Sequence, residues 1–462
     1  MTGTSVRYLL ILAWLVVGTD FRCLRAAPLA AQVDLGAVRV PHFEGWGVSL
    51  CWWAHIMGNF TNREEIADLA FKDLGLNIVR YNIGGGENPR RDNTMEWRAR
   101  IPGYAPATNK WDWAADASQR WMLQAAVKRG ANKVVAFANS PPYWMTVSGS
   151  VTGSANGRDD NLLPEQEGAF AHYLALVTSN LVAVDKIPVG WVTPMNEPGS
   201  DWWQLGHRQE GTHMSVAQQQ RVVKWLRQEL DQAGLPQIGV VATEDNDEAR
   251  ARASLAAYST NTLSLISPLV THTYTANDAP ALQALAERTG KPLWVSEYGD
   301  GERTGLLLAR RIRDDLTDLR AAAWIYWQFA DGGNWGLIRN RLDGEHQSFQ
   351  RTRKYPVMAQ FSRFIRPGCR LVATDQPDTL AACDSNRHEL ILVVVNDHSH
   401  ALELTYSLKG ANAATDGLGY RTSADEEVSP LPAFPIVHNQ FTMKFPAGSV
   451  TTLVIPEPTL TF

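Results

Sequence analysis

The sequence predicts an α/β protein that contains a (β/α)8 TIM barrel and a small β-sandwich side domain. Eight short apolar runs alternate with helix-like stretches between about residues 43 and 330. A count of eight favours a closed parallel barrel over an open doubly wound sheet. Beyond residue 362 the helical periodicity ends and closely spaced β runs follow. The length of 462 residues accommodates one large barrel and one small partner domain.

The barrel is expected to occupy residues 43–362. Its eight predicted strands lie within residues 43–52, 77–85, 133–142, 190–198, 238–245, 269–275, 293–300 and 322–331. Amphipathic segments separate them, for example NREEIADLAFKDLG (62–75) and SVAQQQRVVKWLRQELDQAG (215–234). Each of these two segments closes at a glycine, which is a common way for a helix to end.

The β-sandwich is expected to comprise residues 32–42 and 363–462. Four β runs with turns between them follow the barrel: HELILVVVND, ALELTYSLKG, NQFTMKFP and SVTTLVIPE. The run VDLGAVRV (33–40) precedes the barrel and also has the pattern of a strand. We expect it to join the same sandwich, so that both ends of the chain meet in one domain.

The N-terminal segment has the three-part layout of a secretory signal peptide, which we assign to residues 1–31. Arg7 precedes the apolar run YLLILAWLVVG, and a stretch rich in small residues follows. Cleavage after Gly18 or near Ala31 fits this layout. The apolar run is shorter than the roughly 20 residues that a membrane-spanning helix needs. We therefore expect a secreted, extracellular protein without stable membrane association.

Composition and cysteine spacing limit the kinds of ligand and macromolecule that the protein is expected to bind. A formal net charge of −5 gives no basic surface for nucleic acid. The spacings of the four cysteines suit no zinc site, and HRQEGTH (207–213) lacks the HExxH spacing, so we expect neither metal nor cofactor. Cys369 and Cys383 flank a predicted hairpin, where a disulfide is plausible in an oxidising compartment. We expect the protein to be a monomer.

Two glutamates stand in the same context at the ends of predicted strands. Glu197 follows the fourth strand and Glu297 follows the seventh. Because the carboxyl ends of barrel strands meet at one rim, the two side chains can converge on one pocket. Paired carboxylates are what glycoside hydrolysis needs, and a separation of about 5–5.5 Å belongs to the retaining mechanism. The 17 tryptophans include several at strand ends, where indole rings suit the apolar faces of sugars.

The motifs around these glutamates resemble those of a known family. MNEP (195–198) and VSEYG (295–299) look like the large clan of retaining (β/α)8 glycosidases. With FEGWGVSLCWWA, VRYNIGGG, ANSPPYWM and FSRFIRPG, the chain resembles glycoside hydrolase family 30 over nearly its whole mature length. The resemblance implies that Glu197 is the acid/base and Glu297 the nucleophile. It also implies that Asn196 hydrogen-bonds the 2-hydroxyl group of the sugar.

Further residues are candidates for binding the substrate. Arg80 and Tyr274 are expected to contact Glu297, although Arg80 could also be a structural ion pair. Trp327 is expected to form the floor of the subsite of the cleaved sugar. Tyr274 and His272 have ordinary packing at the barrel mouth as an equal alternative. Three aromatic residues are expected to border the cleft: Trp53, Tyr143 and Trp144.

The substrate expected from the resemblance is a polysaccharide or oligosaccharide with β-1,6-linked galactose. The stretches GWGVSLCWWA, RYNIGGGENP and NSPPYWMTVSGSVTG look most like the endo-β-1,6-galactanase branch, and the insertion GSDWWQLGHRQEG (199–211) adds aromatic surface. The implied enzyme is a retaining endo-glycosidase acting on the galactan side chains of arabinogalactan. A β-1,6-glucanase or another family 30 glycosidase, such as a glucosylceramidase or xylanase, is the alternative. The alternative without catalytic activity is a carbohydrate-binding pseudoenzyme.

Overall fold

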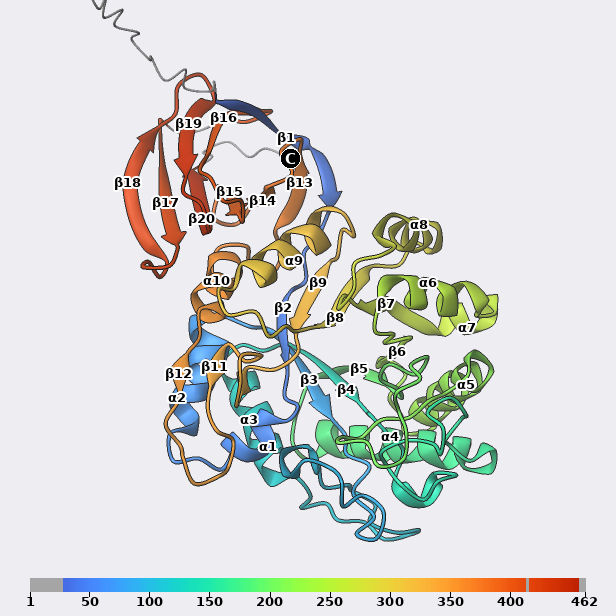
Figure 1. Cartoon of the computed structure of the whole chain (residues 1–462). Coiled ribbons are helices and arrows are strands. Elements are labelled where there is room, and N and C mark those ends of the chain that lie inside the picture. The colour runs from blue at the N-terminus through green and yellow to red at the C-terminus, as the bar shows by residue number, and fades with distance from the viewer. Residues whose placement is uncertain (1–27, 413–414, 457–462) are drawn as a thin grey trace, which may run out of the picture.

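The computed structural model describes residues 28–412 and 415–456 and shows a barrel next to a separate sheet domain (Figure 1). Of the expected signal peptide, residues 1–27 lie outside the described residues, while residues 29–31 belong to the first strand. Within the described part of the chain no helix is both long and apolar enough to cross a membrane.

Eight parallel strands close into the barrel, as the sequence predicts. They are β2 (Gly45–Ser49), β3 (Ile78–Asn82), β4 (Lys133–Phe137), β5 (Val189–Thr193), β6 (Gly239–Ala242), β7 (Ile266–His272), β8 (Leu293–Tyr298) and β9 (Ala323–Tyr326). The barrel closes where Trp46 of β2 lies beside Trp324 of β9. Every residue of β2, β3, β8 and β9 is buried, which is typical of strands covered on both faces.

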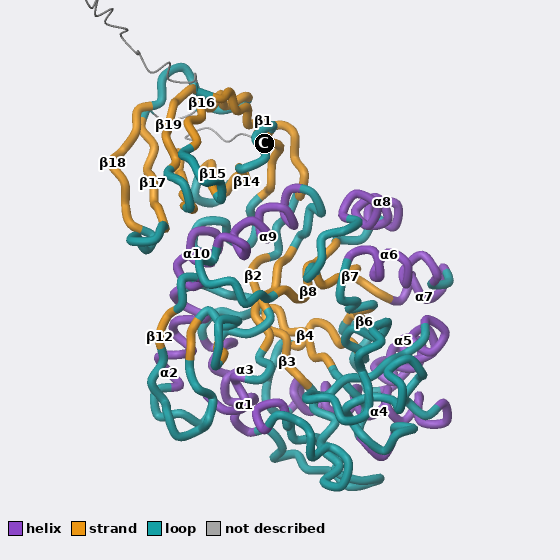
Figure 2. The backbone as a smooth tube through the Cα atoms, viewed as in Figure 1, coloured by secondary structure: helices purple, strands orange, loops and turns teal. Residues whose placement is uncertain are grey.

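Helices surround the barrel, as Figure 2 shows. The longer ones are α3 (Ala117–Lys128), α4 (Glu167–Ala183), α5 (Val216–Gln232), α6 (Glu248–Ala257), α8 (Ala279–Thr289), α9 (Leu306–Thr317) and α10 (Lys354–Ser362). Shorter segments are α1 (Trp53–Met57), α2 (Arg63–Ala67), α7 (Thr260–Leu265), a π-helical turn at Asp68–Asp73 and 3-10 turns at Trp97–Ala99, Tyr143–Met145 and Pro164–Gln166. The start of α5 follows from its N-cap, because the Ser215 side chain accepts a hydrogen bond from the Gln218 backbone.

The sheet domain consists of nine strands in one continuous, mostly antiparallel sheet. Its strands are β1 (Leu29–Val40), β13 (Arg370–Thr374), β14 (Thr379–Asp384), β15 (Glu389–Asn396), β16 (Leu402–Lys409), β17 (Asp416–Thr422), β18 (Ser429–Pro435), β19 (Gln440–Phe445) and β20 (Ser449–Pro456). β1 lies between β13 and β16, antiparallel to the first and parallel to the second. The expected contribution of an N-terminal strand is thereby confirmed.

The alternation of side chains along β15 explains how the two parts are joined. Leu390, Leu392 and Val394 belong to the core of the sheet domain, whereas Ile391 and Val393 belong to the core that includes the barrel. Because successive side chains of a strand point to opposite faces, β15 packs on both cores at once. On the barrel side of the sheet, α9 contacts β14, β15 and β20, and α10 contacts β17 and β20. The sheet domain therefore braces one side of the barrel.

The plausible disulfide is absent from the structure. Cys369 and Cys383 are both buried and are not joined to each other. The register of the hairpin pairs Cys383 with Arg370, so Cys369 lies just before the ladder. Cys369 packs into the core that includes the barrel, and Cys383 packs into the core of the sheet domain. The two thiols therefore face different sides of the sheet.

Candidate active site

A cavity of about 400 Å³ lies at the carboxyl ends of the barrel strands. The loops after β5 and β6, the ends of β7 and β8, and the segment after β9 supply its walls. Eleven residues line it: Asn196, Glu197, Trp202, Trp203, His207, Gln209, Asn246, Tyr274, Glu297, Trp327 and Trp335. Five of these residues, Asn196, Glu197, Tyr274, Glu297 and Trp327, are candidates from the sequence.

Glu197 and Glu297 lie close together in this cavity. One carboxylate oxygen of each residue lies within 4.8 Å of the other. Both side chains are almost fully buried, with 7% of Glu197 and 3% of Glu297 exposed. A pair of carboxyl groups about 5–5.5 Å apart is the arrangement of a retaining glycosidase, whereas an inverting enzyme needs about 6.5–9.5 Å.

The carboxylate of Glu297 is held by two donors. Nη1 of Arg80 donates to Oε2 at 2.5 Å, and Oη of Tyr274 donates to Oε1 at 2.8 Å. Burial, followed by the nearby charge of Glu297, raises the pKa of Tyr274 well above its usual range, so the phenol keeps its proton. The Arg80 Nη2 group also donates to Oδ1 of Asn196 at 3.1 Å. The contacts expected for Arg80 and Tyr274 are therefore present.

Glu197 sits where the backbone turns sharply after β5. Its φ of 48° lies in the left-handed region, which is strained for a residue with a side chain. Two backbone contacts hold the turn: the N–H of Glu197 donates to the carbonyl of Glu244 at 2.7 Å, and its carbonyl accepts from the indole of Trp203 at 2.9 Å. Oε1 of Glu197 accepts from Nδ2 of Asn246 at 2.6 Å. The turn thus aims the carboxyl group into the cavity.

A buried charged cluster lies beneath the two glutamates. The His272 ring places Nδ1 3.2 Å from Glu197 and 3.6 Å from Glu297, and Nε2 3.3 Å from Glu244. Glu244 is fully buried and also accepts from Oγ of Ser296 at 2.6 Å, while Nη2 of Arg80 lies 3.4 Å away.

The electrostatics of this cluster favour charged forms. Burial disfavours imidazolium, but the carboxylates of Glu297, Glu197 and Glu244 outweigh it and raise the pKa of His272 to about 10. Burial likewise opposes ionisation of Glu244, but the Arg80 charge and the His272 hydrogen bond lower its pKa below the ordinary value. His272 is therefore a cation at neutral pH, paired with the carboxylates around it.

His272 contacts the two glutamates but does not line the cavity, so it acts from behind them. Glu244 is the main residue that sequence reasoning left unassigned. As a lone glutamate after the fifth strand it is equally compatible with a solvated surface position. Only the partners contributed by β3, β7 and β8 reveal that it is a buried counter-ion.

The expectation for Trp53 is wrong. Its indole is fully buried, donates to the carbonyl of Ser49 and packs against Phe329. Trp53 begins α1, so its side chain turns into the core, whereas the neighbouring Trp52 meets Trp327 edge to face at 5.3 Å. Trp52, not Trp53, therefore stands behind the aromatic wall of the cavity.

Tyr143 and Trp144 also do not line the cavity. Oη of Tyr143 donates to the carbonyl of Pro106, and Nε1 of Trp144 donates to the carbonyl of Ala105. Both side chains are thereby tied to the loop after β3. The cleft border comes instead from the insertion, through Trp202 and Trp203, and from Trp335 in the loop between β10 (Ala330–Asp331) and β11 (Ile338–Arg339).

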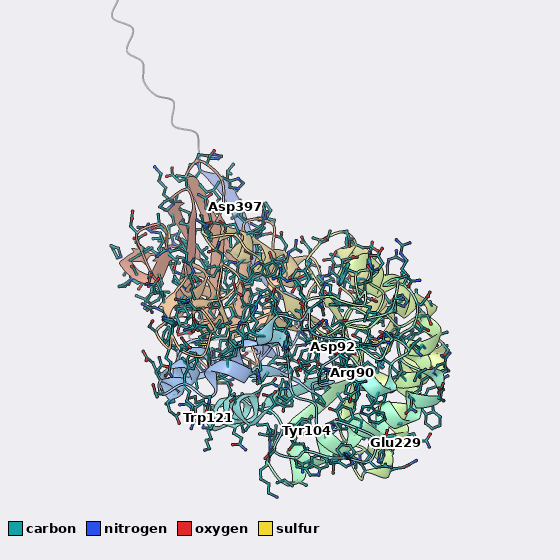
Figure 3. The ribbon with its side chains drawn as sticks, turned by 60° about the horizontal axis from the view of Figure 1, so that its bottom comes forward. Arg90, Asp92, Tyr104, Trp121, Glu229 and Asp397 are labelled. Atoms are coloured by element: carbon teal, nitrogen blue, oxygen red, sulfur yellow. The ribbon has the colours of Figure 1, made fainter. Side chains whose placement is uncertain are left out.

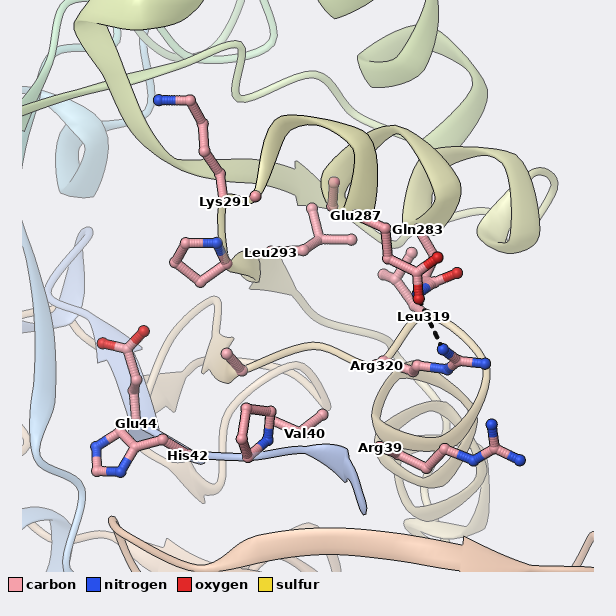
Figure 4. A pocket seen from close by; sticks show the side chains of 15 residues that line it. Arg39, Val40, His42, Glu44, Gln283, Glu287, Lys291, Leu293, Leu319 and Arg320 are labelled. Atoms are coloured by element: carbon pink, nitrogen blue, oxygen red, sulfur yellow. Dashed lines mark hydrogen bonds and ion pairs between the residues drawn. The ribbon is translucent and has the colours of Figure 1, made fainter. Parts of the chain in front are cut away.

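Another cavity, of about 370 Å³, lies at the opposite end of the barrel (Figure 4). Glu44 precedes β2 and Leu293 begins β8, so this cavity borders the amino ends of the strands. Its charged groups include the ion pair between Glu287 and Arg320 at 2.9 Å. Catalytic groups of such barrels lie at the carboxyl ends, and residues at the amino ends serve stability.

Two glutamates that converge at the carboxyl ends of a (β/α)8 barrel, in a cavity walled by indole rings, define the class of the protein as a glycoside hydrolase. Residues 33–279 match the model of O-glycosyl hydrolase family 30. The chain is 32% identical over 455 residues to an endo-β-1,6-galactanase from Hypocrea rufa, covering 89% of this chain and 92% of the relative. The chain belongs to O-glycosyl hydrolase family 30.

Solved structures share the fold. A conserved exported protein from Bacteroides fragilis superposes with a TM-score of 0.79 at 22% identity, covering 92% of this chain and 100% of that one. A family 30 subfamily 8 xylanase from Clostridium acetobutylicum superposes with a TM-score of 0.72 at 20% identity, covering 92% and 99%. At these identities the likeness concerns the architecture of barrel and side domain.

Proposed function

We propose that the protein is a retaining endo-β-1,6-galactanase that cleaves the β-1,6-linked galactan of arabinogalactan side chains. The observation that carries this proposal is the approach of Glu197 and Glu297 to within 4.8 Å in one cavity. The similarity to an endo-β-1,6-galactanase over most of both chains supports the choice of substrate. We also propose that the chain is secreted, because its N-terminal sequence has a signal-peptide layout; sequencing the N-terminus of the exported protein tests this.

In the first step Glu297 attacks the anomeric carbon and the glycosidic bond breaks. Arg80 and Tyr274 fix the orientation of the attacking carboxylate. Glu197 gives its proton to the departing glycosidic oxygen, so the leaving sugar departs as a neutral alcohol. Asn246 holds the Glu197 carboxyl group through the hydrogen bond from its Nδ2 to Oε1.

In the second step water attacks the covalent glycosyl-enzyme. Glu197, now a carboxylate, removes a proton from this water, and the bond between the sugar and Glu297 breaks. Two inversions at the anomeric carbon leave the product with the configuration of the substrate. Asn196, held by Arg80, is placed to hydrogen-bond the 2-hydroxyl group in both transition states.

The aromatic walls favour a sugar chain as the ligand. Trp327 provides an apolar surface beside Glu297, and Trp335, which is 40% exposed, extends it beyond Tyr274. Trp202 stands on the Glu197 side, with the guanidinium of Arg250 5.6 Å from its ring centroid. Because galactose presents a flat patch of C–H groups, such rings bind it by stacking. Surfaces on both sides of the cleavage point suit attack within a chain.

The test is a side-by-side assay of β-1,6-galactan, β-1,6-glucan, xylan and glucosylceramide. The wild type is expected to release reducing ends from galactan, and Glu297→Gln is expected to lose this activity. Glu167→Gln is the matched control, because Glu167 is a buried carboxylate paired with Arg221 on the outer helices. Preference for glucan would support the β-1,6-glucanase alternative. Binding of galactan without any turnover would support the pseudoenzyme.

A further inference from the structure

A second pocket, of about 220 Å³, lies outside the catalytic cavity and shares no lining residue with it. The loop after β3 forms one wall through Thr108, Asn109 and Trp111, and the segment after β4 contributes Trp144. Gln166 and the first half of α4 form the other wall. Loops that follow barrel strands lie at their carboxyl ends, so this pocket lies toward the same end of the barrel as the catalytic cavity.

The pocket carries a flat aromatic surface that reaches solvent. The rings of Trp111 and Trp113 stack 4.8 Å apart with an interplanar angle of 4°, and Trp111 also stacks on Tyr173. The exposed fractions are 36% for Trp111 and 38% for Trp113. Figure 3 labels Tyr104, which lies 6.1 Å from the Trp113 ring. Large apolar rings held at the surface in a fixed plane commonly mark a binding site.

Three polar side chains around these rings lack a partner among the described residues. The side chains of Thr108, Asn109 and Gln166 make no hydrogen bond to any other residue that the structure describes. His172 stands beside them, with Nδ1 2.7 Å from a carboxylate oxygen of Glu229, which Figure 3 also labels. Two amides, a hydroxyl group and an imidazole beside these aromatic rings match the alternating hydroxyl and C–H surfaces of a sugar.

We propose that the pocket between Trp111, Trp144 and α4 is a second galactan-binding site, which holds a stretch of the same polymer away from the cleavage point. This proposal rests on the proposed function, since it takes its ligand from it. The pocket is large enough for about one sugar residue, with Trp113 continuing the aromatic surface. Binding there raises the local concentration of chain at the catalytic cavity, an advantage only for substrates long enough to reach both sites.

The experiment compares Trp111→Ala with Trp225→Ala, which removes a similarly exposed tryptophan (40%) from α5. We expect Trp111→Ala to raise KM for polymeric galactan by about 3- to 10-fold, with kcat unchanged. Hydrolysis of a short galacto-oligosaccharide, too short to reach both sites, is expected to stay at the wild-type level. Trp225→Ala is expected to behave as wild type on both substrates.

Gln166→Ala provides a second variant that leaves the aromatic stack in place. It is expected to show a smaller rise in KM for the polymer and the same neutrality on the short substrate. As a direct binding test, Glu297→Gln is run in a gel containing galactan; adding Trp111→Ala is expected to reduce its retardation.

Unchanged retardation and unchanged KM in both pocket variants would overturn the second site while leaving the proposed function intact. Equal losses on the polymer and on the short substrate would also overturn it, because they would indicate a distorted catalytic cavity. Failure of the wild type to cleave galactan would instead reject the proposed function, and with it the choice of ligand for the pocket.

Discussion

Replacing Glu244 with glutamine removes one negative charge from the cluster beneath Glu197 and Glu297 while preserving the shape of the side chain. The carboxylate lies 3.3 Å from His272 and 3.4 Å from Arg80, and all three side chains are fully buried. Loss of its charge therefore weakens the stabilisation of both cations at once. Removal of one partner from a buried ionic cluster costs about 3 kcal/mol or more in the free energy of unfolding.

The size of the effect on His272 follows from its surroundings. Its pKa of about 10, against an ordinary value of 6.5, reflects the three carboxylates that face it, since burial acts in the opposite direction. The difference corresponds to roughly 5 kcal/mol in favour of imidazolium. Glu244 is one of these three carboxylates, so its replacement removes part of this preference for imidazolium, on the order of 1 kcal/mol, and lowers the pKa of His272 below its wild-type value.

The raised pKa of His272 also determines how its contribution to stability changes with pH. Because folding raises the pKa of His272, its contribution to stability is complete below about pH 6.5 and is lost as the pH rises to about 10. In Glu244→Gln this contribution is smaller and is exhausted at a lower pH than in the wild type. The stability difference between wild type and variant is therefore largest at neutral and mildly acidic pH.

The assay is an NMR titration of protein labelled at histidine Cε1. The sequence has 11 histidines, and the signal of His272 is identified by its loss in His272→Gln. Denaturant unfolding at pH 6.5 and pH 9.5 measures the accompanying change in stability, with Glu167→Gln as the control for loss of a remote buried carboxylate. Titration of wild-type His272 near 6.5, or an identical titration in Glu244→Gln, would refute the reasoning.

Four further outcomes test the site and its surroundings. Glu197→Ala is expected to lose about 100- to 10,000-fold in turnover of galactan but to keep activity on substrates with good leaving groups, partly restored by azide; unchanged pH dependence without rescue would remove the acid role. Proton NMR of the first product is expected to show retention of configuration, and an inverted anomer would exclude double displacement. Trp53→Ala is expected to lower the free energy of unfolding by about 3–5 kcal/mol. Trp327→Ala is expected instead to raise KM about tenfold, and equal effects of the two changes would contradict their separate placement.

The architecture was largely predictable because its signals are local and repeated. Each barrel strand is a short apolar run, and the chain shows eight of them with helices between. The run at residues 33–40 has the same strand-like pattern as the β runs after residue 362. This pattern alone predicts that it belongs to the side domain. What the pattern does not reveal is the side-chain direction at a strand end. A disulfide between Cys369 and Cys383 looks plausible in sequence, but the sheet separates the two thiols into different cores.

The site was predictable where a residue stands in a motif next to a strand. Asn196, Glu197 and Glu297 belong to this group, and all three line the cavity. Asn246 and Trp335 are on loops that no motif marks, and only the closure of the barrel brings them to Glu197 and Tyr274.

The adjacent tryptophans Trp52 and Trp53 show a second reason why a site residue could not be predicted from the sequence. Trp52 and Trp53 are adjacent residues of the same type, so the sequence does not distinguish them. Because α1 starts after Trp52, the indole of Trp52 turns toward Trp327 and that of Trp53 turns into the core. A difference of one residue at a helix start decides which ring faces the site, and composition carries no information about it.

The role of Glu297 is tested most directly by trapping the covalent intermediate. A 2-deoxy-2-fluoro-galactosyl donor with a good leaving group forms the glycosyl-enzyme but slows its hydrolysis. Mass spectrometry of peptides from the treated protein is expected to find one added sugar, attached to Glu297, and none in Glu297→Gln. A label on any other residue, or turnover of the donor with inverted product and no label at all, would contradict the account.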